Sequence, residues 1–468
     1  MGLAGGPNGA KAVFKHTFSS AFRNFDNLTQ ARKAVGVGRS ETLAVLDGNV
    51  LVMAIPASVD TFPAYVTVLA NQINAAVQAA AHVVVVFDEP AALTKAKAEE
   101  QRARDSRRTP RTPMCSGDLV ACPKDDDYMT TDLKAEGLNV RLLMNHRPTR
   151  GRFHDALCVA VLEHLKANLV GGSEESWSLT FDGIDRRGAD RPIGEKRHAG
   201  ILSSHPEMWN RVLARDEPIG EGDLKLTDVC HRVHAQRTVD ASSPLAKVVL
   251  NLVNTVDTDS FLIELLQQSR REARSDDDDR NELTLLCLRE PTRKRKGEVP
   301  TRAYFQCIDL STFHDEISKY MFGVNVSLPD FVERKKLTMA LLAACIALCG
   351  CDFVAVQGLR CDLILPCVRD VARNSPDVLK LMHGVFTGKA SDVRNASGAI
   401  RAVVENFIES LSGMSGHMNR SRLNASKYDD MQILRSCWIL SYWLGYEFKD
   451  VTKWGFCHIA PDDESRAV

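Results

Sequence analysis

Carboxylate side chains that follow apolar segments are the residues of this sequence best suited to chemistry. Asp257 and Asp259 come after the apolar run 248–253, which has the composition of a buried strand. Two carboxylates spaced two residues apart at the end of a strand lie on the same side of the pleat. Because such groups repel each other, burying them together requires a shared cation, a shared proton or solvent. Most D-x-D pairs are solvated loop residues, so this pair needs other acids nearby to indicate a metal site.

Two more aspartates occupy the same kind of position. Asp47 follows the apolar run 42–46, and Asp88 follows the run 82–87. Short β-branched or apolar runs separated by helical segments predict the parallel sheet of an α/β fold. A single Asp at a strand end is usually a turn residue or a helix cap. Three such strand ends in one chain favour a ligand site, because open α/β sheets bind ligands at the carboxyl ends of their strands.

A second acidic pair, Glu221 and Asp223, opens an amphipathic helix that we expect to continue through His234. The helix dipole favours acids in the first turn, so helix capping explains this pair without any catalytic role. Whether the two acids cap the helix or join the aspartates at the strand ends depends on the fold.

A basic pair lies on a helix expected over residues 91–108. Lys95 and Arg102 are seven residues apart and therefore share one helical face. The ordinary explanation for such residues is a solvated charged surface. The sequence from about 107 to 128 contains several Arg and Pro residues and is expected to form an irregular excursion.

Composition excludes some classes of protein and leaves others open. The 468 residues carry 59 Lys and Arg against 60 Asp and Glu, so the net charge gives no indication of nucleic-acid binding. The 13 Cys residues do not have the spacing of a disulfide framework, and neither a signal peptide nor a membrane-spanning run is visible. We therefore expect an intracellular, non-secreted protein with no membrane partner.

In chain order, these acids resemble the motifs of the flap endonuclease (XPG-type) nucleases, a superfamily that includes the 5′→3′ exoribonucleases. Lys95 and Arg102 match the basic pair that family members carry beyond the second aspartate, and 348–353 is similar to the family's G-C-D-[YF] motif. The resemblance implies a PIN-like α/β fold, with a mainly parallel sheet flanked by helices, a helical arch and a helical C-terminal region. It also implies a site for two Mg²⁺ ions, for which Mn²⁺ can substitute, built from seven acids: Asp47, Asp88, Glu221, Asp223, Asp257, Asp259 and Asp352.

The same resemblance suggests how the chain is divided and what it binds. Residues 1–370 would form the nuclease core, with an arch at 103–150, a charged loop at 270–300 and a helix-two-turn-helix clamp at 345–375. Residues 371–468 would form a helical C-terminal region. DNA with a 5′ single-stranded flap or end would be the partner, held by five residues outside the acidic site: Arg104, Arg107, Arg108, Arg111 and Gly358.

Several departures from the family pattern bear on the substrate. Where the exoribonucleases place a Gln and a second Arg in their phosphate pocket, this chain has Glu99 and Ala103, which argues against a nuclease for 5′-monophosphate RNA. Of the glycines in the G-I-G turn that binds potassium in flap endonucleases, only Gly358 is present. The C-terminus carries no clear sliding-clamp peptide, and its aromatic residues are similar to those of flap-endonuclease-like proteins of large DNA viruses.

The sequence therefore favours a metal-dependent 5′ nuclease that cuts branched DNA in replication, repair or recombination, in the nucleus or at a viral replication site, with other replication or repair proteins as candidate partners. Two alternatives stay open. One is a 5′→3′ exoribonuclease of the same superfamily. The other is a catalytically inactive PIN-like scaffold that binds nucleic acid or protein; retention of all seven acids argues against it.

Overall fold

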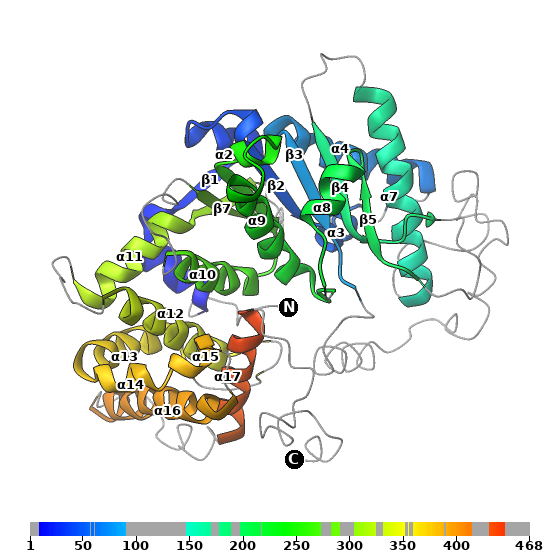
Figure 1. The fold of residues 1–468 in the computed structure, drawn as a ribbon. Helices are drawn as coiled ribbons and strands as arrows, with labels where there is room; N and C mark the ends of the chain where they lie inside the picture. The colour runs from blue at the N-terminus through cyan, green and yellow to red at the C-terminus, as the bar shows by residue number, and fades with distance from the viewer. Residues whose placement is uncertain are drawn as a thin grey trace, which may run out of the picture.

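In the computed structural model, the described part of the chain comprises residues 9–56, 58–59, 61–89, 147–169, 177–188, 197–216, 218–272, 282–290, 304–323, 331–351, 354, 359–387, 390–413 and 430–444. These residues form one α/β assembly with a central sheet and a separate layer of helices on one side (Figure 1). None of the described helices has both the length and the apolar content to cross a membrane.

The central sheet has eight strands in the order β1-β8-β7-β6-β2-β3-β4-β5. Five neighbouring strands, from β7 to β4, run parallel. The edges are antiparallel, because β8 pairs in that sense with both β7 and β1, and β5 pairs in that sense with β4. The strands are β1 Phe22–Phe25, β2 Thr42–Asp47, β3 His82–Val86, β4 Ser178–Ile184, β5 Gly200–Ser203, β6 Leu250–Thr255, β7 Leu283–Glu290 and β8 Tyr304–Asp309.

The α/β class expected from the sequence is confirmed, but the sheet as a whole is mixed. The antiparallel pairs β4–β5 and β7–β8 each join strands that are consecutive in the chain, and such pairs need no crossover helix. Strand β7 was also missed: it lies inside the segment 270–300, which we expected to be a charged loop. Acidic and basic runs on both sides of β7 mask a short apolar strand that is buried between β6 and β8.

Strand β2 occupies the centre of the parallel part of the sheet. After β2 the chain adds β3 and β4 on one side, and it later adds β6 and β7 on the other side. The strand order therefore reverses between β2 and β6. In open α/β sheets, this reversal leaves a crevice at the carboxyl ends of the two strands, where ligands bind.

Side chains alternate between the two faces of the sheet. Leu43 and Val45 pack in one hydrophobic core together with helices α9 (Gly222–Val239) and α10 (Asp259–Glu272). Ala44 and Leu46 pack in a second core, on the opposite face, with α4 (Phe62–Ala79) and α7 (Arg147–Leu169). The fully buried strand β2 is thus covered by helices on both faces, as a parallel α/β sheet requires.

A layer of C-terminal helices packs against α10 through α12, in yellow to red in Figure 1. Residues 337–348 of α12 are all buried, because α10, α13, α16 and α17 surround this helix. The boundary expected at residue 370 falls within α13, which packs on α12 and α16. The helices of this layer are α12 Phe331–Leu348, α13 Cys361–Asn374, α14 Pro376–Lys380, α15 His383–Thr387, α16 Ala390–Gly413 and α17 Asp430–Trp443.

Shorter helices connect the strands and cover the remaining edges. The expected arch at 103–150 lies outside the described residues, except for 147–150, which already belong to α7. In the expected clamp at 345–375, helices α12 and α13 pack on each other, but half of the turn between them lies outside the described part. The remaining helices are α1 Ala10–Thr17, α2 Leu28–Ala34, α3 Gly48–Met53, α8 Pro206–Val212 and α11 Leu310–Phe322.

Candidate acidic active site

Asp47 is the last residue of β2 and stands beside the point where the strand order reverses. It continues the alternation of Leu43 and Val45, so it leaves the sheet on the face covered by α9 and α10. Its Oδ1 accepts a hydrogen bond from the Val50 amide at 3.2 Å, which caps α3. Its Oδ2 accepts one from Thr255 Oγ1, at the end of β6, at 3.3 Å. The helix-capping role expected for a strand-end Asp is therefore present, and a contact to β6 is added to it.

Other carboxylates lie close enough to Asp47 to change its ionisation. Burial, followed by the negative charges of Asp88 and Asp257, raises the pKa of Asp47 to about 7, against the lowering effect of its hydrogen bonds. Asp47 is only 8% exposed. The ends of β2, β3 and β6 thus bring three acids into one electrostatic cluster.

The acids that open α9 belong to the same cluster. Burial, Asp257, Asp47 and Glu221 together raise the pKa of Asp223 well above its usual value. Ser260 Oγ, in the first turn of α10, donates a hydrogen bond to Asp223 Oδ1 at 2.6 Å. Glu221 is the N-cap residue of α9, but its side chain makes no capping hydrogen bond. A side-chain cap therefore does not account for Glu221, while Asp223 lies in the first turn of α9, where the helix dipole favours an acid.

The chain segments that carry these acids are also joined directly. The Gly222 amide donates a hydrogen bond to Asp88 Oδ1 at 2.8 Å, and the Glu89 amide donates one to the Gly220 carbonyl at 2.7 Å. A Cβ atom on Gly222 would lie 3.2 Å from Asp88 Oδ1, which is tighter than ordinary packing. We refer to this pair of reciprocal contacts between residues 88–89 and 220–222 as the acidic clamp.

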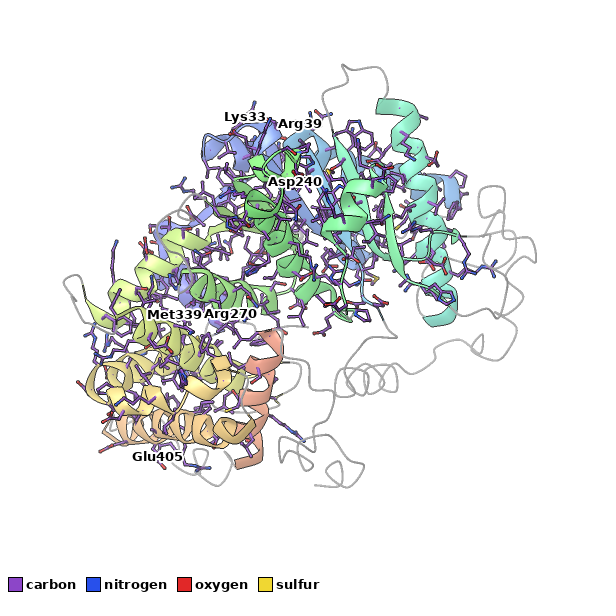
Figure 2. All side chains as sticks on the ribbon, in the orientation of Figure 1. Lys33, Arg39, Asp240, Arg270, Met339 and Glu405 are labelled. Atoms are coloured by element: carbon purple, nitrogen blue, oxygen red, sulfur yellow. The ribbon has the colours of Figure 1, made fainter. Side chains whose placement is uncertain are left out.

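Helix α9 runs so that its first turn reaches the carboxyl end of the sheet. Its other end is marked by Asp240, the C-cap residue, which lies with Arg39 at the upper end of the sheet in Figure 2. Arg39 precedes the first residue of β2, so this is the amino end of that strand. Glu221 and Asp223 consequently face the end of the sheet at which Asp47 lies.

The D-x-D pair differs from its prediction. Strand β6 ends at Thr255, so Asp257 lies in the following loop and Asp259 is the first residue of α10. Asp257 Oδ1 accepts a hydrogen bond from the Asp259 amide at 3.1 Å. The expectation that both carboxylates share one side of a strand is wrong, because the strand ends before them. Asp257 is among the groups that raise the pKa of Asp47 and Asp223, and Asp259 is buried at the start of α10.

The structure brings together Asp47, Asp88, Glu221, Asp223 and Asp257. In the described part of the chain, no three His, Cys, Asp or Glu side chains are already arranged as a ligand set for a metal ion. Asp259 lies buried at the start of α10, and the remaining predicted site residues lie outside the described residues: Lys95, Arg102, Arg104, Arg107, Arg108, Arg111, Asp352 and Gly358.

One residue of this region was not singled out from the sequence. Lys225, one turn after Glu221 on α9, is fully buried, and its Nζ lies 3.5 Å from both Glu89 Oε2 and Asp182 Oδ1. A signal was present, because Lys225 falls at four-residue spacing on the apolar stripe that includes Val229 and Val233.

Comparison with known proteins assigns this chain to no family. No model of a protein family matches the chain, and no curated protein matches it. The acidic cluster and the motif order described above are therefore the basis on which a function can be proposed.

Proposed function

We propose that this protein is a Mg²⁺-dependent, structure-specific 5′ nuclease that hydrolyses phosphodiester bonds in branched DNA. The observation that carries the proposal is the convergence of five acids from four distant segments at the carboxyl end of the sheet, beside the β2–β6 reversal. Open α/β sheets bind their ligands at this position. A cluster of solvated loop residues would not place two of its carboxylates, Asp47 and Glu221, in buried positions beside other negative charges.

The chemistry of these donors suits a hard divalent cation. Mg²⁺ and Mn²⁺ prefer carboxylate and water oxygens, and the cluster offers carboxylates without His or Cys. The pKa of Asp47 is raised first by burial and then by the negative charges of Asp88 and Asp257, and a bound cation would offset both effects. Because the described carboxylates do not already form a ligand group, we expect cation binding to require rotation of their side chains.

The proposed division of roles follows from the contacts. Asp47, Asp223 and Asp257 would hold the cations. Bound cations would stabilise the attacking and leaving oxygens of a phosphodiester. Thr255 and Ser260 hold two of these carboxylates by hydrogen bonds, which limits the rotamers they can adopt. Lys95 and Arg102 would neutralise and orient the scissile phosphate.

The deciding experiment compares matched substrates with the purified protein. With Mg²⁺ present, we expect a 5′-flap DNA to be cut faster than the same duplex without a flap, and faster than a 5′-monophosphate RNA of the same sequence. EDTA should abolish the activity. The Asp47→Asn/Asp257→Asn variant should lose cleavage while remaining folded by circular dichroism.

The outcomes separate the open alternatives. Equal or faster degradation of the RNA would assign the protein to exoribonuclease chemistry. Binding of flap DNA without metal-dependent cleavage would favour an inactive scaffold. Asp240→Asn is a suitable control variant, because Asp240 lies at the opposite end of α9 and pairs with exposed Arg211.

A further inference from the structure

Lys225 is a fully buried cation beside a cluster of anions. Its Nζ lies 3.5 Å from Glu89 Oε2 and 3.5 Å from Asp182 Oδ1, and its side chain has 0% exposure. A Lys side chain is almost never fully buried unless it is paired with acids. Here the two acids come from different segments: Glu89 follows β3, and Asp182 lies in β4.

The backbone of β4 is shaped around this ammonium group. Gly183 has a φ of +93°, and the register between β4 and β5 shifts between residues 182 and 184. A Cβ atom at Gly183 would lie 2.9 Å from Lys225 Nζ and 2.8 Å from the Phe87 carbonyl oxygen. A β-bulge with a left-handed glycine thus leaves the space that the Lys225 side chain fills.

Lys225 also belongs to a row of alternating charges that begins nearer to solvent, at Arg232, and ends at Glu89. Arg232 Nε lies 2.8 Å from Asp228 Oδ2, and the same oxygen lies 2.7 Å from Arg215 Nε. Arg215 Nη2 lies 2.8 Å from Asp182 Oδ2, and Asp182 and Glu89 follow through Lys225. Three cations alternate with three acids, so the row is neutral and each buried acid has a cationic neighbour.

Glu89, the last acid of the row, is also part of the acidic clamp. Its amide donates to the Gly220 carbonyl, and the neighbouring Asp88 accepts from the Gly222 amide. Lys225 lies on the same helix as Gly222, less than one turn away. Lys225 therefore ties the side chain of Glu89 to α9, while the Glu89 amide binds Gly220, just before the start of that helix.

We propose that Lys225 is a positioning residue that holds the segment of Asp88 against the first turn of α9, and so sets the spacing of the acids in the cation site. The second half of this statement rests on the proposed function; the first half does not. Removing the ammonium would leave the buried Asp182 and the half-buried Glu89 with less compensating charge, and we expect the two acids to separate or to draw in water.

The test compares Lys225→Met with Arg232→Met. Both changes remove one cation from α9 and from the same row, but Arg232 lies at the exposed end, far from the clamp. Hydrogen exchange of peptides that cover residues 86–90 and 219–224 reports on the Glu89 and Gly222 amides without any metal. We expect exchange to be about tenfold faster in Lys225→Met and unchanged in Arg232→Met.

A second readout addresses the cation site. The Mg²⁺ concentration that gives half of the thermal stabilisation should rise about tenfold or more in Lys225→Met, as for other residues that orient ligands, and should stay at the wild-type value in Arg232→Met. If Lys225→Met alone does not fold, the Lys225→Met/Glu89→Gln variant removes both charges together and should show the same loosened amides.

The results distinguish the two proposals. Wild-type exchange rates at both amides in a folded Lys225→Met or double variant would overturn the inference, whatever the metal data show. Faster exchange with an unchanged Mg²⁺ midpoint would overturn its second half. If the wild-type protein shows no response to Mg²⁺ but the variant loosens the clamp, the proposed function fails and the structural role of Lys225 stands.

Discussion

A Cβ atom on Gly48 would lie 2.4 Å from the ring of Phe87. Gly48 directly follows Asp47, and Phe87 directly precedes Asp88. The ends of β2 and β3 can therefore lie this close only because residue 48 has no side chain. This contact accompanies the pairing of Asp47 with Val86, which holds the two strand ends together.

Gly48→Ala should separate these two strand ends. Phe87 is buried, so its ring cannot move away freely, and overpacking of this kind typically costs about 1–3 kcal/mol. We expect urea denaturation to show a loss of that size, together with reduced cleavage. Gly200→Ala is the matched control, because a Cβ atom there meets nothing within 4 Å. A Gly48→Ala protein as stable and as active as the control would show that the spacing is not constrained here.

Asp47→Asn should stabilise the metal-free protein at alkaline pH. Asp47 has a folded-state pKa of about 7, above the ordinary value of 3.8, so the folded state binds more protons than the unfolded state. The wild-type free energy of unfolding should therefore rise as the pH falls from about 7 to about 4. At about pH 8 the variant should be more stable by up to about 4 kcal/mol, and this difference should disappear near pH 4. Asn can still accept the hydrogen bond from the Val50 amide.

Magnesium should reverse that order. A cation bound to the carboxylates would stabilise the wild-type protein at about pH 8 and stabilise Asp47→Asn much less, because the amide is a weaker ligand. Thermal unfolding at several Mg²⁺ concentrations measures this effect. A variant that is less stable than the wild type at about pH 8 without metal would contradict the crowding of acids around Asp47.

His82 provides an opposite pH dependence in another part of the sheet. Burial, His205 and Arg39 lower the pKa of His82 to about 4, and its Nδ1 lies 2.9 Å from Ser178 Oγ. The folded state therefore binds fewer protons than the unfolded state. The contribution of His82 to the free energy of unfolding is complete above about pH 6.5 and is lost as the pH falls towards 4. The difference in unfolding free energy between wild type and His82→Gln should shrink by up to about 3 kcal/mol over this window. A constant difference would show that His82 is not held neutral.

The expected contact of Lys95 and Arg102 with the scissile phosphate can be tested by mutation, although both residues lie outside the described part of the chain. Contacts that strengthen as charge develops lower the barrier more than they tighten binding of the ground state. Lys95→Ala and Arg102→Ala should each slow single-turnover cleavage by roughly a hundredfold to a thousandfold, with substrate affinity changed only a few-fold. Rates near the wild-type value would mean that the two residues form a solvated surface.

Local patterns predicted the strands that bear the acids. Strands β2, β3 and β6 are short apolar runs that end close to an Asp, and each is buried between helices, so composition and burial agree. Strand β7 was missed because charged residues flank a short apolar run, and its burial depends on its pairing with β6 and β8, which its own sequence does not indicate. The pairing of β1 with β8 is likewise nonlocal, and no periodicity within the four residues of β1 indicates it.

The site was predictable as a list of residue types but not as a geometry. The role of Asp257 depends on β6 ending at Thr255, because side chains beyond the end of a strand no longer follow the alternation of the pleat. Likewise, the hydrogen bond between Ser260 and Asp223 joins two helices, so neither sequence alone indicates it. The buried position of Lys225 depends on a bulge in a third segment.

The last described helix has a consequence for shortened forms of the protein. Gln267 Nε2 and Arg270 Nη1 of α10 donate hydrogen bonds to the carbonyls of Trp443 and Leu444, at 3.2 Å and 2.6 Å. Figure 2 shows Arg270 where α10 meets α17. The helix whose first turn holds Asp223 through Ser260 is thus supported by a helix that lies far along the chain from it. A protein truncated before α17 would leave α10 without this support, so truncation there should disturb the acidic cluster although it removes none of its carboxylates.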